Sequence, residues 1–168
     1  MKGVENMIYS FGTNEYMQYV LDNYSKLLIR LAFTYVKNMH DAEDIAQDVF
    51  VSLMKRGYGF ESEEHEKAWL LRVAINKCKN DLKSSWKKLN VPLDEDISYL
   101  PEEDSEVLDI VLNLPVKYRT VIHLHYYENY SINEIAELLR RKPATIGTWL
   151  ARGRNLLKSN LIGGLEYE

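Results

Sequence analysis

The sequence has one cysteine, four prolines and eight glycines among 168 residues, and none of its apolar runs is long enough to span a membrane. The single thiol, Cys78, excludes an intrachain disulfide framework and argues against a cysteine-based zinc site. The N-terminal residues lack the apolar segment of a signal peptide, so we expect a cytoplasmic protein. Because Gly and Pro are scarce, helices can continue over long stretches, and we predict an all-α fold.

The residue patterns that catalysis usually requires are also missing. The sequence has no glycine-rich phosphate loop, no Ser/His/Asp set and no paired catalytic carboxylates. His123 and His125 would point to different faces of a helix, whereas a helical metal pair needs a spacing of four residues. The pair His40 and Asp41 is explained by Asp41 capping a helix. We predict that the protein is not an enzyme and uses no metal or cofactor.

The charged residues are segregated along the chain. A net charge of −4 and a pI near 5.6 argue against a non-specific DNA coat. The acidic clusters lie at 41–48, 61–66 and 94–109, and the basic clusters lie at 72–88 and 140–158. This asymmetry predicts two basic surfaces for nucleic acid and acidic surfaces for another partner.

The N-terminal half predicts a bundle of amphipathic helices. Thr13 or Asn14 could cap a short helix, and a second helix would carry the apolar residues of 24–35. The segment 41–55 has the 3.6-residue apolar period, with these residues on one stripe: Ala42, Ile45, Ala46, Val49, Phe50, Leu53 and Met54. Its opposite face is acidic and amide-bearing, with Glu43, Asp44, Gln47, Asp48 and Ser52.

The segment from Glu64 to about Trp86 predicts a helix with two distinct faces. Ala68, Leu71, Ile75, Cys78 and Leu82 recur at core spacing. A second stripe consists of Arg72, Asn76, Lys79, Asn80, Lys83 and Lys87, with Trp69 at its N-terminal end. Basic and amide side chains beside an aromatic ring suit a nucleic-acid backbone that ends at an unstacked base. The alternative is a solvated lysine face with a half-buried tryptophan.

The segment 91–104 is rich in acids, contains two prolines and predicts a linker between two domains. After it we expect helices at 105–113 and 115–129. The stretch 130–158 then predicts two helices joined by a tight turn. Ser131 and Glu134 form a capping box, and Pro143 suits the first turn of the second helix.

The second of these helices would have an apolar inner face and a polar outer face. Its inner face is Ile146, Leu150, Gly153 and Leu157, and its outer face is Thr145, Thr148, Arg152, Asn155 and Ser159. The first helix would bury Ile132, Ile135, Ala136 and Leu139. With no acid between Arg140 and Lys158, the pair predicts a helix-turn-helix DNA reader. A plain helical hairpin with a solvated basic face is the alternative.

Three strings in the sequence carry a resemblance to a known family. They are DAEDIAQDVF at 41–50, WLLRVAINKCKNDL at 69–82 and LPVKYRTVIHLHYYENYSINEIAELL at 114–139. Together, in this order and spacing, they resemble the extracytoplasmic-function group of bacterial sigma factors. The resemblance implies two small helical domains joined by a flexible acidic linker: sigma region 2 at 14–88, the linker at 89–104 and the region 4 helix-turn-helix at 105–160.

The resemblance also implies partners and site residues. Core RNA polymerase would be bound through its largest-subunit clamp helices and its flap, and the clamp surface here would be Asp44, Gln47, Asp48 and Val51. The −10 promoter element would be recognised and melted by Trp69, Arg72, Asn76, Lys79, Asn80 and Lys83. The −35 element would be read by Lys142, Thr145, Thr148, Trp149, Arg152 and Arg154. The loop 57–64 would border the −10 pocket.

One departure from the family pattern concerns the −35 reader. Many members carry Lys or Arg where this chain has Gly147 and Trp149. Gly147 weakens a helix by roughly 1 kcal/mol relative to Ala. Trp149 cannot neutralise a phosphate, although it could pack on a thymine methyl or on a partner protein. The −35 affinity is therefore expected to be low, or its sequence preference unusual.

The leading hypothesis is a sigma factor that directs promoter-specific initiation, and two other classes remain open. One is a helix-turn-helix regulator that acts without polymerase, which would need neither the stripe near Trp69 nor the acidic face near Gln47. The other is a sigma-like decoy bound only by proteins, which Gly147 and Trp149 would favour. The resemblance also implies an anti-sigma factor that occludes both domains.

Overall fold

The computed structural model describes residues 9–85 and 105–166, and every regular element in these two ranges is a helix. The chain divides into two compact units between residues 94 and 95. The all-α fold with two helical domains is therefore confirmed. The predicted linker at 89–104, with Trp86 and Lys87 before it, lies outside the described residues.

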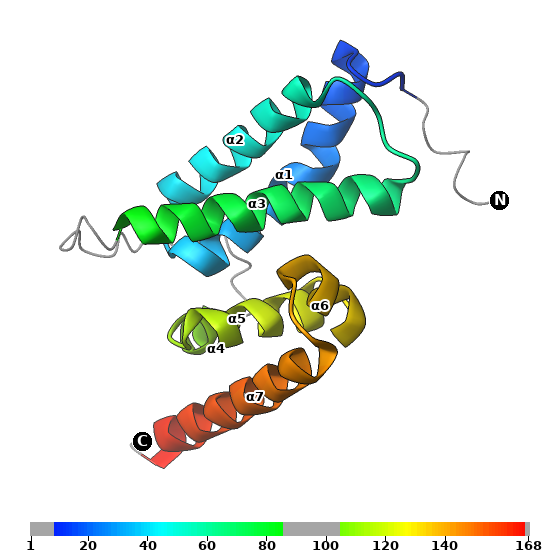
Figure 1. Ribbon diagram of the computed structural model, residues 1–168. Coiled ribbons are helices and arrows are strands. Elements are labelled where there is room, and N and C mark those ends of the chain that lie inside the picture. Colours follow the sequence, from blue (N-terminus) through cyan, green and yellow to red (C-terminus); the bar gives the residue numbers. More distant parts are fainter. Residues whose placement is uncertain (1–8, 86–104, 167–168) are drawn as a thin grey trace. The chain divides into compact units, whose positions relative to one another are not determined.

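The first unit is a bundle of three helices, α1 (Asn14–Val36), α2 (Met39–Arg56) and α3 (Glu63–Ser85), each of which packs against the other two (Figure 1). Its centre is formed by fully buried aliphatic side chains: Val20, Leu28, Leu31, Val49, Leu53, Leu70, Leu71 and Ile75. Removing this much apolar surface from water supplies the main driving force for the bundle.

A buried carboxylate joins α1 to α3 inside this bundle. Glu66 is only 4% exposed, and its Oε2 accepts a hydrogen bond from the Tyr16 hydroxyl at 2.5 Å. On the outside of the same contact, the Tyr19 hydroxyl donates to Glu63 Oε1 at 2.9 Å. Burial and the neighbouring carboxylate raise the pKa of Tyr16 well above its usual range. Both tyrosines therefore stay protonated as donors, and α3 is held on α1 at one rotation about its own axis.

Three predictions for this unit were wrong. The two helices expected before residue 36 are one continuous helix, because no Gly or Pro interrupts the chain and Asn23 Nδ2 donates back to Tyr19 O at 2.7 Å. Asn38, not Asp41, caps α2 by accepting from Asp41 N at 2.9 Å. Met54 is 59% exposed and does not belong to the core.

The second unit consists of α4 (Ser105–Leu112), α5 (Val116–Ile122), α6 (Ile132–Leu139) and α7 (Pro143–Glu166), with the short π-helix η3 (His123–Tyr127) directly after α5. The long helix α7 packs against α4, α5 and α6. Its inner face holds the buried residues Ile146, Leu150 and Gly153, as the apolar period predicted.

The structure differs from the sequence predictions at four places in this unit. The helix expected at 115–129 contains a π-helical turn, in which Glu128 N donates to His123 O at 3.2 Å. Ile132 is 38% exposed, because it occupies the first turn of α6 outside the buried stripe. Val107 is 43% exposed. The helix expected to end near Lys158 continues to Glu166.

The close approach of α5 and α7 depends on Gly153. A Cβ atom there would lie 3.2 Å from Ile122 Cγ1 and 3.5 Å from Tyr118 Cβ. Gly147, on the same helix, would place a Cβ atom in open space. The first glycine is therefore required by packing, while the second only lowers the helix propensity of α7.

We predict that Gly153→Leu destabilises the second unit by roughly 1–3 kcal/mol, because the added side chain overpacks the α5–α7 contact. Gly147→Ala should instead stabilise α7 by up to about 1 kcal/mol. Hydrogen exchange of peptides from residues 105–166 measures both effects, and peptides from residues 14–85 serve as the internal control. Equal protection in both variants would contradict this account of Gly153.

Candidate nucleic-acid interface

The outer face of α2 carries the four residues expected to bind polymerase. Asp44, Gln47, Asp48 and Val51 are all exposed. Val51 is 40% exposed, and Met54, which the sequence pattern had placed in the core, follows Gln47 by two helical turns on the same face. The structure therefore brings two carboxylates, an amide and two apolar side chains together on one strip. Such a mixed strip suits a protein partner.

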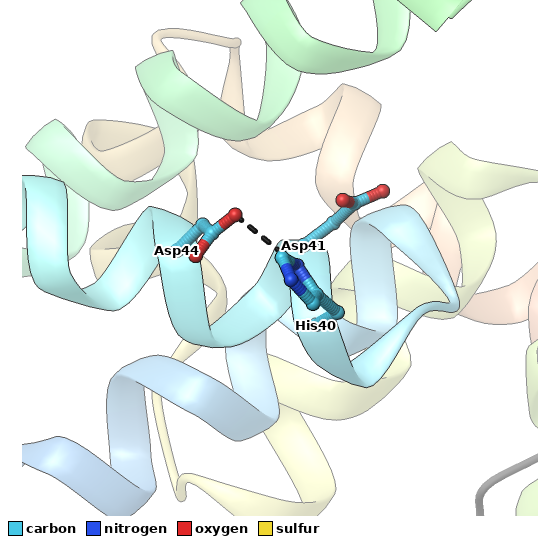
Figure 2. A group of neighbouring side chains, drawn as sticks. All are labelled: His40, Asp41 and Asp44. Atoms are coloured by element: carbon cyan, nitrogen blue, oxygen red, sulfur yellow. Dashed lines mark ion pairs between the residues drawn. The ribbon is translucent and has the colours of Figure 1, made fainter.

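At the N-terminal end of this strip, three side chains that could ligate a metal come together (Figure 2). The possible ligand atoms of His40, Asp41 and Asp44 lie within 4.8 Å of one another, and His40 Nδ1 is 3.2 Å from Asp44 Oδ2. The side chains of His40 and Asp44 are 81% and 60% exposed. An exposed pair on one helix face and an aspartate at a helix N-terminus account for this group without a metal.

The predicted stripe on α3 is present and lies apart from the core face. Arg72, Asn76, Lys79, Asn80 and Lys83 are all exposed. The opposite face is packed, with Leu71, Ile75 and Cys78 at most 1% exposed. The stripe therefore contributes nothing to the core and faces solvent along α3.

An aromatic cluster stands at the N-terminal end of this stripe. The guanidinium carbon of Arg56 lies 4.1 Å from the centroid of the Tyr58 ring, 4.2 Å from that of Phe60 and 5.2 Å from that of Trp69. Arg56 Nε also donates to Tyr58 O at 3.1 Å, which holds the loop that follows α2. Phe60 packs on Trp69 with ring centroids 5.7 Å apart. The half-buried Trp69 is thus held in place, and Tyr58 is left 65% exposed beside it.

The sequence interpretation missed Arg56 and Tyr58. A signal was present, because an arginine in the last helical turn is followed by two aromatic residues alternating with glycines. Such interleaving of basic and aromatic residues is typical of surfaces that bind single-stranded nucleic acid.

The acids of the loop 57–64 and of the first turn of α3 are largely explained by the fold. Glu63 and Glu66 point to the tyrosines of α1, and a carboxylate near a helix N-terminus is favourable. Ser62 Oγ accepts from His65 N at 3.1 Å and so caps this end of α3. Only Glu61 and Glu64 in this segment are exposed acids.

The helix-turn-helix of the second unit is formed as predicted (Figure 1). Ser131 Oγ accepts from Glu134 N at 3.1 Å, and Glu134 Oε1 accepts from Ser131 N at 3.4 Å, which completes the capping box. Arg140 ends α6 in the left-handed conformation with φ 54°, and Arg141 N donates to Ala136 O at 3.0 Å. The chain therefore reverses into Pro143 within three residues.

Five of the six residues assigned to the −35 element lie together. Lys142, Thr148 and Arg152 are exposed, while Thr145 and Trp149 are half-buried. Thr148 Oγ1 donates to Ala144 O at 3.0 Å, so its hydroxyl proton is already used within the helix. The sixth residue, Arg154, lies apart from them, because its Nη1 donates to the Tyr126 hydroxyl at 3.0 Å.

Arg154 instead borders an apolar groove of about 520 Å³ in the second unit. The groove is lined by Val107, Val111, Ile122, Tyr126, Tyr127, Arg154, Leu157, Lys158 and Leu161. Three of these side chains are largely open to solvent, with exposed fractions of 50% for Tyr126, 43% for Val107 and 43% for Leu161. An apolar groove with a basic rim suits a protein segment better than DNA.

The two histidines face different sides of their helix, as expected, and each has a neighbour within the fold. His123 is 6% exposed, its Nε2 is 3.3 Å from Glu128 Oε1, and its ring stacks on Tyr127 at 5.6 Å. His125 Nδ1 lies 2.8 Å from Tyr130 O. A carbonyl only accepts, so the proton of His125 is assigned to Nδ1.

Comparison with known proteins agrees with this arrangement of helices and surfaces. The family model for Sigma-70 region 2 matches residues 20–88, and the model for Sigma-70, region 4 matches residues 104–157. The matched class is thus that of the sigma-70 transcription factors, with one region in each structural unit.

Curated relatives indicate to which group of sigma-70 factors the chain is similar. The ECF RNA polymerase sigma factor SigW of Bacillus subtilis is 30% identical over 164 residues, which cover 84% of this chain and 87% of SigW. The RNA polymerase sigma factor SigV of the same organism is 30% identical over 138 residues, covering 79% of this chain and 82% of SigV. The chain belongs to the extracytoplasmic-function group of RNA polymerase sigma factors.

Solved structures share the fold. The sigma factor RpoE of Bartonella quintana, in complex with the anti-sigma factor NepR, matches with a TM-score of 0.68 at 17% identity over 89% of this chain and 98% of RpoE. CnrH, in complex with the cytosolic domain of CnrY, matches with a TM-score of 0.68 at 21% identity over 90% of this chain and 91% of CnrH. Within the described ranges, no helix is both long and apolar enough to cross a membrane.

The thiol of Cys78 reports on the packed face of α3. Burial raises the pKa of Cys78 to about 12, above its ordinary value near 9. We predict that iodoacetamide alkylates Cys78 in the native protein at least roughly a thousandfold more slowly than in the unfolded chain at pH 8, because the thiolate is the reactive form. Mass spectrometry after timed quenching measures both rates.

The same shift predicts how stability depends on pH. The contribution of Cys78 to the free energy of unfolding is fully present below about pH 9. Above that pH the unfolded chain releases its thiol proton while the folded chain keeps it, so the contribution is lost. A Cys78→Ala variant should lack this alkaline loss. In the alkylation experiment, rapid reaction of the native protein at pH 8 would contradict the burial of Cys78 on the core face of α3.

Proposed function

We propose that this chain binds core RNA polymerase and directs promoter-specific transcription initiation, recognising the −10 and −35 elements and melting the −10 element without forming covalent bonds. It would act in the cytoplasm, where bacterial polymerase works. One observation carries this proposal. The chain has two candidate DNA surfaces in separate units, the basic and amide stripe of α3 and the helix-turn-helix of α6 and α7.

In this proposal α3 melts and holds the −10 element. Arg72, Lys79 and Lys83 bind phosphates, while Asn76 and Asn80 bind the edge of an extruded base. Trp69 lies at the end of the stripe, where a base leaves the duplex stack. Unstacking costs a few kcal/mol, and capture in a polar pocket beside an aromatic ring offsets that cost. Support comes from the exposure of all five polar side chains and from the packing of Trp69 on Phe60.

The helix α7 would enter the major groove at the −35 element. The half-buried Thr145 and the exposed Arg152 lie on the same side of α7 as Thr148, where side chains of a recognition helix would meet base edges. Lys142 precedes the helix and would bind a phosphate. The hydrogen bond of Arg154 to Tyr126 favours a role at the groove for this residue, and not at the bases.

Two surfaces would bind polymerase. The strip of Asp44, Gln47, Asp48 and Val51 on α2 would bind the clamp helices of the largest subunit, and the exposed Met54 extends it. The apolar groove of the second unit would receive the flap, because it combines exposed aromatic and aliphatic side chains with the basic rim of Arg154 and Lys158.

An anti-sigma factor would hold the chain inactive. Two proteins with this fold were solved with a bound partner, the sigma factor RpoE with the anti-sigma factor NepR and CnrH with the cytosolic domain of CnrY. The surfaces that polymerase would use are exposed in this chain, so one partner that covers them could compete with polymerase.

Run-off transcription tests the proposal and its two alternatives. Purified bacterial core polymerase is combined with a pool of randomised promoter sequences, with and without this protein. Transcripts that depend on the protein and share two upstream motifs are the expected result. Binding to core without transcripts would favour a decoy. Failure to bind core, with retained binding to duplex DNA, would favour a helix-turn-helix regulator that acts alone.

We predict that Asn76→Ala with Asn80→Ala reduces open-complex formation about tenfold or more while polymerase binding is unchanged, because hydrogen bonds to an extruded base are lost. Permanganate footprinting measures opening, and co-elution with core measures binding.

Asn14→Ala with Asn23→Ala removes two exposed asparagines from α1 and is the matched control. A wild-type footprint for the α3 variant would refute base capture by these residues.

We also predict that Gln47→Ala with Asp48→Ala weakens the binding of core polymerase about five- to fiftyfold, since both side chains would lie at the centre of that interface. Titration of labelled core enzyme measures the affinity. Gln18→Ala with Asp22→Ala removes an equivalent exposed pair from α1 and should leave the affinity unchanged. Equal affinities for the two variants would count against the α2 strip.

A further inference from the structure

Trp149 stands where a basic residue is common in the family, and two cations from other parts of the second unit lie near its ring. Lys117 Nζ is 5.9 Å from the centroid of the Trp149 ring, and the guanidinium carbon of Arg141 is also 5.9 Å from it. Both distances fall within the range of cation–π attraction. Lys117 belongs to α5 and Arg141 to the turn before α7. Both cations near the Trp149 ring therefore come from elements other than α7.

A second aromatic residue orders the same surface. Lys117 Nζ lies 5.0 Å from the centroid of the Tyr118 ring. The neighbouring guanidinium of Arg152 and then the charge of Lys117 lower the pKa of Tyr118. Two cationic side chains on this side of the unit, Lys117 and Arg141, therefore lie near aromatic rings, and Lys117 lies near two of them.

The elements that form this surface supply no acid to neutralise it. Neither α5 nor the segment 140–161 contains Asp or Glu. Lys117 and Arg141 are exposed, whereas Trp149 is half-buried beneath the solvent-facing surface. Cations that are pre-positioned and unneutralised in this way attract an anion.

We propose that Trp149 is a positioning residue, which holds Lys117 and Arg141 so that both bind backbone phosphates beside the −35 element. The proposal rests on the function proposed above and extends it to residues outside the recognition helix. Phosphates are the fitting ligand, because elements that flank a recognition helix meet the DNA backbone and not the base edges. The tryptophan itself then reads no base.

Salt dependence separates phosphate contacts from base contacts. The holoenzyme, formed with core polymerase, is bound to duplex DNA carrying a −35 element chosen from a random pool, over a series of salt concentrations. Lys117→Ala and Arg141→Ala should each weaken binding about equally for all sequences. Each should also reduce the slope of log affinity against log salt by about 0.9, the loss of one phosphate contact.

Trp149→Ala should reduce the same slope by between about 1 and 2, because both cations lose their support. Trp149→Phe keeps an aromatic ring and should restore most of the slope. In a background that already carries Lys117→Ala and Arg141→Ala, Trp149→Ala should change the slope no further. Lys26→Ala removes an exposed lysine from α1 and is the control. Hydrogen exchange over residues 105–166 verifies that each variant is folded.

Three outcomes would overturn the proposal. A wild-type slope for Lys117→Ala and Arg141→Ala would show that these cations bind no phosphate. A wild-type slope for Trp149→Ala with an altered sequence preference would make the tryptophan a base reader. If the wild-type holoenzyme neither binds this DNA nor starts transcription, both the Trp149 proposal and the function proposed above fail. This outcome is distinguishable from the other two because the wild-type protein alone shows it.

Discussion

The hydrogen bond between Tyr16 and the buried carboxylate of Glu66 is the constraint on which the first unit depends. An unpaired carboxylate that is 4% exposed would be strongly unfavourable, so the helices α1 and α3 can pack only where the tyrosine hydroxyl reaches it. Apolar packing alone tolerates small rotations of a helix, whereas a buried polar pair does not. Fixing the rotation of α3 also fixes the direction of its exposed stripe. The candidate DNA surface at Asn76 and Asn80 is thus oriented by a contact in the first turn of the same helix.

Both units use aromatic rings to place cations at their candidate DNA surfaces. In the first unit one guanidinium, that of Arg56, contacts three rings and holds a loop. In the second unit one ring, that of Trp149, has two cations near it. Arg and Lys side chains lose considerable rotamer freedom when they bind a rigid ligand. Contacts that order them beforehand reduce this loss, so a chain with net charge −4 can concentrate ordered positive charge where DNA would lie.

Much of the fold and of the two candidate DNA surfaces could be predicted from the sequence, because these features depend on local chemistry. The capping box of Ser131 and the two faces of α3 follow from spacing alone, and the structure confirms both. Other features depend on competition or on distant contacts that spacing does not reveal. Asn38 lies closer to the true start of α2 than Asp41 does, and both are good caps. The helical period of α7 already places Arg154 on another side than Arg152, but its bond to a tyrosine 28 residues away is not encoded by that period.

The π-helical turn at His123–Tyr127 gives the second unit a property that its other helices lack. Such a turn holds one residue more than the α-helical turn that would replace it. Deleting a residue there could be absorbed by conversion to α-helix, with α5 and α6 left in register. The same deletion in α7 would rotate everything beyond it by about 100° and turn its outer face away from a ligand. This unit can therefore lose a residue at one site without changing which side chains form its candidate DNA surface.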